Sequence, residues 1–383
     1  MRIVIFGTGK FYNENKHHIK DQDCIIAFLD NNKLVQGQQV DGITIYAPHE
    51  IHNQSYDKVV LMSIHAAKMK KQLLELGVSE DRIWTWRRYE SEYSRGVLKL
   101  FCHREKNQKF KKSILLLSTD LNYNGGSIAA VNAVRALQLQ GYRVILATPF
   151  GDEKFMNEVS RQDVNIVLCP AINYLEEEEK YWIEQFDIVI VNVFQMISCA
   201  CEISKFKPVL WWIHEPSMSY SNIYERIQVE FSQYNNLAAM ERVNVAAVSK
   251  IAKTNFEEYY PEKVKYVLPY GIPDEYVSDM DGFASEKITF AIIGAIEERK
   301  DQKTFIQAVL KFTSDERNRL EFLIIGADSS DAAYCNEIRE LSKEVPQIKL
   351  MGRLTREEMK KIYSKIDVVV CASLEETMSL KIT

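Results

Sequence analysis

Two basic side chains stand at the start of a predicted helix, where cations are unfavourable unless an anion offsets them. The apolar segment ITFAIIG ends at Gly294 and reads as a buried strand. Arg299 and Lys300 follow it, directly before the helical segment DQKTFIQAVLKF. Because cations at the positive end of a helix dipole cost stability, this pattern predicts that a diphosphate binds there. The adjacent Glu297 and Glu298 could instead neutralise the two cations, which leaves a structural role open.

Three further strand-like segments end in residues that suit sugar binding. ILLLSTD leads to Gly125 and Gly126 and a helix of small residues, where open backbone N–H groups could bind an anion or a sugar hydroxyl. VLWWIH ends in His214, whose imidazole could donate to a hydroxyl or handle a proton. DVVVCAS leads to Glu375 and Glu376. A mere tight turn and a satisfied structural histidine are the alternative interpretations of the first two.

Short apolar segments recur along the whole chain and alternate with segments of helical periodicity. Examples are KVVLMS, RVILAT, DIVIVNV, NVAAVS, LEFLIIG and IKLMG. Such runs, without polar alternation, are typical of parallel strands covered by helices on both faces. Their alternation with helices predicts doubly wound α/β domains. Because ligands of such domains bind beyond the carboxyl ends of the strands, the candidate residues above occupy the expected edge.

Two interruptions of this rhythm divide the chain. The stretch from Arg87 to Lys112 is polar and strongly basic, and the stretch PYGIPDEYVSDMDGFASEK is punctuated by glycine and proline. A solvated linker is one interpretation of the basic stretch, and a basic helix on an anionic membrane surface or a lipid-linked phosphate is the other. The expected parts are an accessory domain at 1–90, a basic linker at 91–112, and larger domains at 113–273 and 274–383.

The front domain carries part of a dinucleotide-binding fingerprint. Gly7 and Gly9 follow a strand-like segment, and Asp30 ends the next one. Glycines in such a turn let the backbone approach a phosphate, and the acid can bind ribose hydroxyls. Tyr12 stands where a third glycine is expected, so nucleotide binding and a structural or docking role both stay open. A nicotinamide-dependent oxidoreductase would rest on the two glycines and Asp30 alone.

Composition describes an ordinary globular chain and excludes some classes of function. The 383 residues are 46% hydrophobic and 26% charged, which suits several domain cores. A net charge of -5 provides no positive field that would gather nucleic acid. Seven cysteines, without a CxxC pair or a Cys/His cluster at zinc spacing, fit a reducing compartment and predict no metal site. With neither a signal-peptide pattern nor a membrane-length apolar run in the sequence, we expect a cytoplasmic protein.

From Ser113 to Thr383, an ordered set of stretches resembles the family 4 glycosyltransferases, which are retaining enzymes of the GT-B fold. The matching stretches are NGGSIAAVNAVRALQLQGYRVILAT, WIHEP, AAVSKIAKTNF, VLPYGIPD, IIGAIEERKDQKTFIQAV, LMGRLTREEMKKIYSKIDVVVCAS and LEETMSLKIT. The front segment, with GTGK, FLDNN and DGITIYAPHEI, resembles small Rossmann-type domains attached to bacterial capsule-synthesis and sugar-modifying proteins. The resemblance implies an α/β protein with a GT-B-like pair of doubly wound Rossmann-type domains, preceded by a small Rossmann-like domain.

The resemblance also implies roles for the candidate residues. Gly125 and Gly126 would line the cleft, and His214 would lie near the donor sugar. Lys300, with Arg299, would hold the diphosphate. The rest of the implied donor site is Gly294 before this loop, Arg353 along the base, Glu376 as the first acid of the family's paired-glutamate motif, and Thr377, Met378 and Ser379 around the donor sugar and phosphate.

The chain departs from the family pattern at three places. Ala295 stands where the family often has arginine, which puts a second phosphate contact in doubt. Tyr270 replaces the asparagine that is usual before the glycine matching Gly271. The second glutamate of the paired motif would follow Thr383, so we expect the C-terminal domain to be truncated.

The implied reaction transfers a hexosyl-type sugar from a nucleotide-sugar donor to a glycan or lipid-linked acceptor, with retention, in bacterial surface or capsular polysaccharide synthesis. Lys300, Arg299 and helix N-termini would stabilise the leaving diphosphate electrostatically, without a metal or other cofactor. A metal-using transferase would rest on Asp279 and Asp281, which have DxD spacing but follow no strand. A non-catalytic nucleotide-sugar-binding or scaffold protein is the other alternative, since part of the donor site would be missing.

Overall fold

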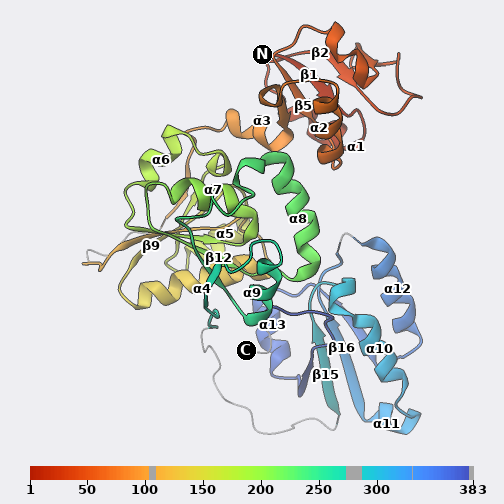
Figure 1. The fold of residues 1–383 in the computed structure, drawn as a ribbon. Helices are drawn as coiled ribbons and strands as arrows, with labels where there is room; N and C mark the ends of the chain where they lie inside the picture. The colour runs from red at the N-terminus through yellow and green to blue at the C-terminus, as the bar shows by residue number, and fades with distance from the viewer. Residues whose placement is uncertain (103–108, 273–286, 330, 379–383) are drawn as a thin grey trace. The chain divides into compact units, whose positions relative to one another are not determined.

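Two compact units, residues 1–270 and residues 271–383, make up the chain (Figure 1). The computed structural model describes residues 1–102, 109–272, 287–329 and 331–378. The first unit contains the front domain and a larger middle domain, and the second unit is a single α/β domain. Among the described residues, no helix is long and apolar enough to cross a membrane.

The front domain is a mostly parallel sheet with the strand order β3-β4-β2-β1-β5-β6. β3 is its antiparallel member and pairs with β4. The strands are β1 (Arg2–Phe6), β2 (Cys24–Leu29), β3 (Gln39–Val40), β4 (Ile43–Tyr46), β5 (Lys58–Leu61) and β6 (Ile83–Thr85). The helices are α1 (Lys10–Asn15), α2 (Ala66–Glu75), α3 (Trp86–Glu92) and the short 3-10 helices η1 (Lys16–His18), η2 (Pro48–Asn53) and η3 (Glu80–Arg82).

Both faces of the front sheet are buried, which explains why its strands lack polar alternation. Side chains that follow one another along a strand point to opposite faces. Ile3 and Ile5 accordingly pack into one core, and Val4 and Phe6 pack into the other. A strand buried on both sides therefore reads as a continuous apolar run.

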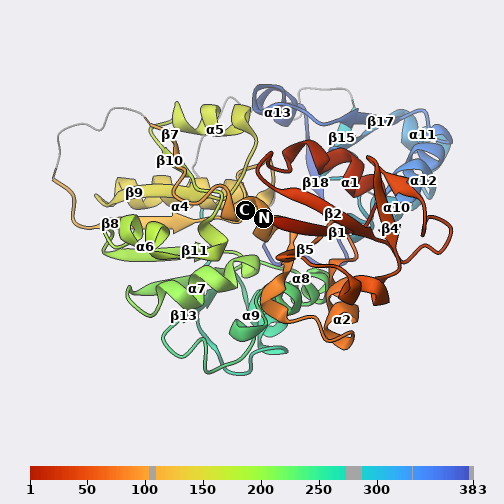
Figure 2. The same cartoon turned by 90° about the horizontal axis from the view of Figure 1, so that it is seen from above.

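The middle domain has the strand order β14-β13-β12-β11-β8-β9-β10-β7, which Figure 2 shows from β13 through β11 and β8 to β7. The strands are β7 (Lys99–Phe101), β8 (Ser113–Leu117), β9 (Arg143–Thr148), β10 (Asn165–Leu168), β11 (Ile188–Asn192), β12 (Val209–Ile213), β13 (Asn244–Ala247) and β14 (Val264–Val267). The α-helices are α4 (Gly125–Leu139), α5 (Glu153–Ser160), α6 (Glu177–Ile183), α7 (Ile197–Ile203), α8 (Ser217–Glu230) and α9 (Lys250–Glu257). The 3-10 helices are η4 (Ile172–Tyr174), η5 (Phe194–Met196) and η6 (Ser232–Tyr234).

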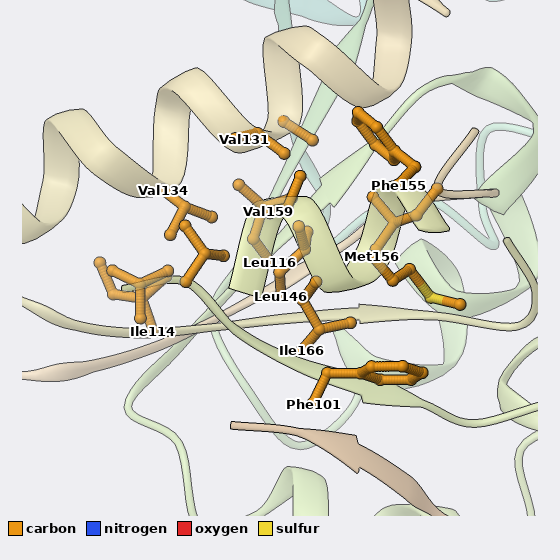
Figure 3. Close-up of a cluster of buried hydrophobic side chains, with 14 residues drawn as sticks. Phe101, Ile114, Leu116, Val131, Val134, Leu146, Phe155, Met156, Val159 and Ile166 are labelled. Carbon is orange, nitrogen blue, oxygen red and sulfur yellow. The ribbon is translucent and has the colours of Figure 1, made fainter. Parts of the chain in front are cut away.

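Strand β7 lies inside the segment predicted to be a linker. It pairs with β10 and is antiparallel, whereas the other strands of this sheet pair in parallel. Phe101 is buried beneath helices α4 and α5, against Ile166 and Met156 (Figure 3). The stretch at 91–112 thus contributes an edge strand and a core side chain to the middle domain, while 103–108 lie outside the described residues.

The second unit has the strand order β17-β16-β15-β18, with parallel pairing throughout the described strands. Its strands are β15 (Ile288–Ile293), β16 (Leu320–Ile325), β17 (Ile348–Gly352) and β18 (Val368–Val370). Its helices are η7 (Glu298–Lys300), α10 (Gln302–Leu310), α11 (Ser314–Asn318), α12 (Ala332–Lys343) and α13 (Arg356–Tyr363). Buried residues of β15, β16 and α10, among them Ile292, Phe322 and Ile306, form its main core.

Candidate functional site

The loops after β15 and β18 lie side by side at the carboxyl edge of the sheet in the second unit. The chain runs from β15 to β16 and β17 on one side and returns as β18 on the other side of β15. Such a reversal is a topological switch point, the place where doubly wound domains bind ligands. Arg299 and Lys300 follow β15, and Glu376 follows β18. The topology therefore brings these three predicted residues together.

Lys300 and Glu376 form an ion pair across this switch point. The Ser373 hydroxyl donates to the same carboxylate at 2.8 Å, and Arg299 lies 3.6 Å from it. Burial raises the pKa of Glu376. The hydrogen bond and charge of Lys300, the hydrogen bond from Ser373 and the charge of Arg299 outweigh burial and hold the pKa below its usual range. The carboxylate is therefore ionised near neutral pH and neutralises Lys300.

Arg299 is held in place by both of its neighbouring loops. Its guanidinium pairs with Glu297 at 2.7 Å, which matches the structural alternative expected for one of the two cations. The same guanidinium donates to the Glu375 carbonyl at 3.1 Å, and the Arg299 carbonyl accepts from the Leu374 N–H at 2.9 Å. Hydrogen bonds thus join the two loops at the switch point before any ligand enters.

Two backbone features fix the start of this loop. The Gly294 N–H donates to the Ile325 carbonyl at 2.8 Å, and the Gly294 carbonyl approaches Gly326 so closely that any side chain at 326 would overlap it. Asp301 adopts a left-handed conformation, φ 49°, and its carboxylate caps helix α10 by accepting from the Thr304 N–H at 3.1 Å. These constraints determine where the Arg299 and Lys300 side chains begin.

The remaining predicted donor-site residues are dispersed. Arg353 is exposed after β17, which lies two strands away from β15. Thr377 and Met378 are half-buried beside Glu376. Ser379 lies outside the described residues, as do Asp279 and Asp281 of the alternative metal site. In the part of the chain that the structure describes, no three His, Cys, Asp or Glu side chains gather as metal ligands.

The middle domain has its own switch point, between β8 and β11. Gly125 and Gly126, predicted as a cleft-lining loop, are the first residues of helix α4, which follows β8. Asn124 caps this helix, because its side chain accepts from the Ser127 N–H at 2.9 Å. The Asn192 side chain at the end of β11 donates to the Gly126 carbonyl at 3.2 Å. The N-terminus of a long helix is therefore fixed at the edge where a ligand is expected.

The residue after β11 is strained. Val193 has φ 71°, a left-handed value that is costly for a β-branched side chain. Its N–H donates to the Trp212 carbonyl at 2.9 Å, and its carbonyl accepts from the Trp211 indole at 2.8 Å. The next N–H, of Phe194, donates to the Glu215 carboxyl at 2.6 Å. Strain of this kind persists where surrounding contacts over-determine the backbone, and it concentrates at functional sites.

His214, at the end of β12, is enclosed by aromatic rings. Its imidazole stacks on Tyr270 at 5.8 Å and meets Trp212 edge-on at 4.5 Å between ring centroids. Burial lowers its pKa to about 3, so the ring is neutral near neutral pH. A neutral imidazole has one donor and one acceptor nitrogen. His214 can therefore bind a hydroxyl but does not supply positive charge.

Glu215 is a buried acid that the sequence pattern did not single out. Its two oxygens accept from the N–H groups of Phe194 and His214, at 2.6 Å and 2.9 Å. Burial raises its pKa to about 7, against the lowering effect of these hydrogen bonds. The only hint of Glu215 in the sequence is its position directly after His214. Its burial could not be predicted from that position, because it depends on β11 and β12 being neighbours. Glu215 positions both strand ends.

In the front domain, the predicted nucleotide-binding residues Gly7 and Asp30 make contacts with neighbouring residues of the protein. Gly7 has φ 107° and lies against the Met62 carbonyl, so it requires glycine. Asp30 accepts from the Thr8 N–H at 3.0 Å and the Thr8 hydroxyl at 2.6 Å, while its other oxygen accepts from the Asn32 N–H at 2.9 Å. Gly9 precedes the six-residue helix α1. Asp30 therefore closes the turn in this structure, and ribose binding by this acid stays a prediction.

Two successive doubly wound domains, each with polar residues at its switch point, are the arrangement found in the GT-B glycosyltransferase fold. Residues 287–383 match a family model described as "Glycosyl transferases group 1", which covers the loops of Arg299, Lys300 and Glu376. Residues 1–84 match a family model described as "C2185-like, N-terminal". No curated protein sequence matches the chain.

Solved structures of low sequence identity share the fold. The Anabaena Alr3699/HepE complex with UDP and glucose is 14% identical, covers 70% of this chain and 76% of its own, and has a TM-score of 0.54. The complex of that protein with UDP-glucose is 15% identical, with 71% and 77% covered and a TM-score of 0.54. Sucrose-phosphate synthase from Thermosynechococcus elongatus is 15% identical, with 71% and 78% covered and a TM-score of 0.50.

These likenesses confirm the predicted fold class, a GT-B-like pair of Rossmann-type domains. Together with the group 1 match, they support a glycosyltransferase. The comparisons do not identify which residues bind or react, so the role of each site residue stays a prediction.

Proposed function

We propose that this protein is a retaining glycosyltransferase that transfers a hexosyl-type sugar from a nucleoside diphosphate sugar to a glycan or lipid-linked acceptor. The observation that carries the proposal is the cluster of Arg299, Lys300 and Glu376 at a switch point, inside the segment that matches the group 1 model. A half-buried pair of cations at such an edge is suited to a diphosphate, because screening by water is reduced there.

In this proposal the diphosphate shares Lys300 with Glu376, which is the partner of that lysine in the free protein. The Lys300 ammonium has three donors and can bind a phosphate oxygen while it keeps a hydrogen bond to Glu376. Arg299, held by Glu297 and the Glu375 carbonyl, presents a fixed fork toward the same place. A carboxylate that is no longer fully engaged by Lys300 can accept a hydrogen bond from a sugar hydroxyl.

The proposed reaction breaks the bond between the anomeric carbon and the diphosphate, and the oxygen of an acceptor hydroxyl forms the new glycosidic bond on the same face. The proton of that hydroxyl passes to an oxygen of the departing diphosphate. Charge accumulates on the leaving diphosphate, so cations positioned in advance lower the barrier electrostatically. Lys300 and Arg299 supply that charge, and the proposal requires no metal or other cofactor. The neutral His214 would hydrogen-bond a hydroxyl of the donor sugar.

The proposed setting is bacterial surface or capsular polysaccharide synthesis on the cytoplasmic side. The structures with the same fold include complexes with UDP and UDP-glucose, which makes UDP the first donor base to test. The front domain matches the C2185-like model. The setting rests on the resemblance of its GTGK, FLDNN and DGITIYAPHEI stretches to domains attached to capsule-synthesis and sugar-modifying proteins. Peripheral membrane contact through the basic stretch at 91–112 stays a prediction.

The test is a thermal-shift screen of UDP, GDP and ADP and their glucose forms, followed by turnover with a radiolabelled sugar donor. We expect the nucleotides of one base to raise the melting temperature. The labelled sugar of the corresponding nucleotide sugar should be transferred to an acceptor or slowly hydrolysed. Binding without any turnover across acceptors would support the non-catalytic alternative instead. A shift with NADH and none with any nucleotide sugar would contradict the proposal outright.

A further inference from the structure

A cavity of about 420 Å³ opens at the carboxyl edge of the middle sheet, and the front domain forms one of its walls. Thr119, Phe150 and Gln195 line it from segments that follow β8, β9 and β11. Arg87 and Glu90 line it from helix α3. Its volume is in the range of small-ligand sites, and it lies where doubly wound domains bind ligands.

Helix α3 is anchored to the middle domain, so this wall is a fixed part of the unit. Arg95, just beyond the helix, pairs at 3.2 Å with the buried Glu179 and donates at 3.0 Å to the Tyr174 carbonyl. Arg88 on the helix lies 3.6 Å from Glu176. Helix α2 of the front domain also packs against α8 (Figure 1), where Lys70 donates to the Val229 carbonyl at 2.5 Å.

Two arginines face the cavity from different domains. Arg87 comes from α3 and Arg226 from α8, and both are accessible to solvent. Within the described residues, neither guanidinium lies within 4.0 Å of a carboxylate. Desolvation, followed by the positive charge of Arg87, lowers the pKa of Arg226, while the charge of Glu230 acts in the opposite direction. Two like charges placed together in this way are unfavourable unless an anion joins them.

Two carboxylates, those of Glu90 and Glu230, also line the cavity. Glu230 accepts a hydrogen bond from the Tyr174 hydroxyl at 2.5 Å, so part of its hydrogen-bonding capacity is already used. Burial raises the pKa of Glu90, against the opposing charges of His18, Arg87 and Lys20. Phe150, over which the Arg87 guanidinium lies at 5.9 Å, adds an apolar ring of the kind that packs on a sugar face.

We propose that this cavity binds an anionic sugar, whose phosphate or carboxylate lies between Arg87 and Arg226, and that the front domain thereby takes part in ligand selection. The assignment of this ligand as the acceptor rests on the proposed glycosyltransferase function, whereas the anion site itself does not. Arginine suits either group, because its planar fork binds phosphate and carboxylate oxygens in pairs. A neutral monosaccharide offers neither guanidinium such a group.

The experiment is calorimetry on the full chain with UDP present in excess, so that any phosphate site in the second unit is occupied. The probes are glucose 6-phosphate for the phosphate arm, glucuronate for the carboxylate arm and glucose as the neutral reference. We expect one or both anionic sugars to bind and glucose to bind at least tenfold more weakly. The stronger of the two anionic probes identifies the source of the negative charge.

The variants are Arg87→Gln and Arg226→Gln, with Arg161→Gln as an exposed control at the end of α5. Each cavity variant should weaken the anionic probe by roughly tenfold or more, as expected for loss of one charge-assisted contact. Arg87→Lys, which keeps the charge, should recover part of the loss, and circular dichroism verifies the fold. Equal binding of glucose, unchanged affinity in both variants, or no binding by either anionic sugar would overturn the inference. UDP binding measured separately reports on the proposed function, so the two can fail independently.

Discussion

Replacing Lys300 by methionine tests the centre of the proposed donor site, because it removes the charge and keeps most of the aliphatic side chain. The Lys300 side chain is 14% exposed and contacts Glu376, which is 21% exposed. After the change, Glu376 retains the Ser373 hydroxyl at 2.8 Å and Arg299 at 3.6 Å. The local structure should therefore survive, and the effect should fall on anion binding.

The expected magnitude follows from one lost charge-assisted hydrogen bond, worth about 1.5–3 kcal/mol. Converted to affinity, this is a roughly ten- to hundredfold weaker binding of UDP, or of whichever nucleoside diphosphate the chain prefers. Glu376, released from its partner, would add repulsion toward the phosphates, so the lower end of that range is a minimum. Since the lost interaction is electrostatic, the variant should also respond less to added salt than the wild type.

Isothermal titration of the full chain at two salt concentrations measures both effects. Lys303→Met is the matched control, because Lys303 lies in the first turn of α10, is 43% exposed and pairs with Glu337 at 2.6 Å. The control should bind as the wild type does. If Lys300→Met binds the nucleotide within twofold of the wild type, Lys300 does not contact the diphosphate and our placement of the donor site fails.

Three further changes test other parts of the structure. Glu376→Gln removes the counter-ion of Lys300, so it should tighten binding of free UDP severalfold while it lowers turnover of the sugar donor; weaker UDP binding would contradict this. Phe101→Ala should lower the free energy of unfolding by about 3 kcal/mol in urea titrations, whereas Leu100→Ala, which alters a side chain 62% exposed on the same strand, should change it little. His214 has a pKa lowered to about 3, so its contribution to stability is full above about pH 6.5 and declines as pH falls toward 3. Between pH 6.5 and 5 that loss amounts to about 2 kcal/mol, and it should be absent in His214→Phe but present in the exposed-site control His49→Phe.

The parts of the site that the sequence could predict are those that follow from local pattern and topology. A strand such as β15 shows itself as an apolar run, and residues after it must lie at the carboxyl edge of a parallel sheet. Arg299, Lys300 and Glu376 could therefore be assigned to one edge. Their contact depends on β18 being the neighbour of β15, a pairing of residues nearly eighty positions apart that family resemblance suggested and local periodicity cannot show.

Other features depend on contacts that leave no local signature. Strand β7 is three residues long with two exposed side chains, so it has too little pattern to stand out in a basic stretch. The hydrogen bonds that Asp30 makes with Thr8 could not be told from the ribose contacts that the same acid makes in other proteins. Arg87 and Arg226 line one cavity only because α3 and α8 both border it, which depends on how the front and middle domains pack.

Strand β7 also has a consequence for exchanging the front domain between proteins. A chimera joined after Phe101 would import a foreign edge strand, whereas one joined near Val97 would leave the native strand on β10. Helix α3 imposes a second condition, since Arg88 on the helix and Arg95 just beyond it must meet the acids at 176 and 179 of the recipient. The junction of such a chimera, natural or engineered, is therefore restricted to the short segment between helix α3 and strand β7.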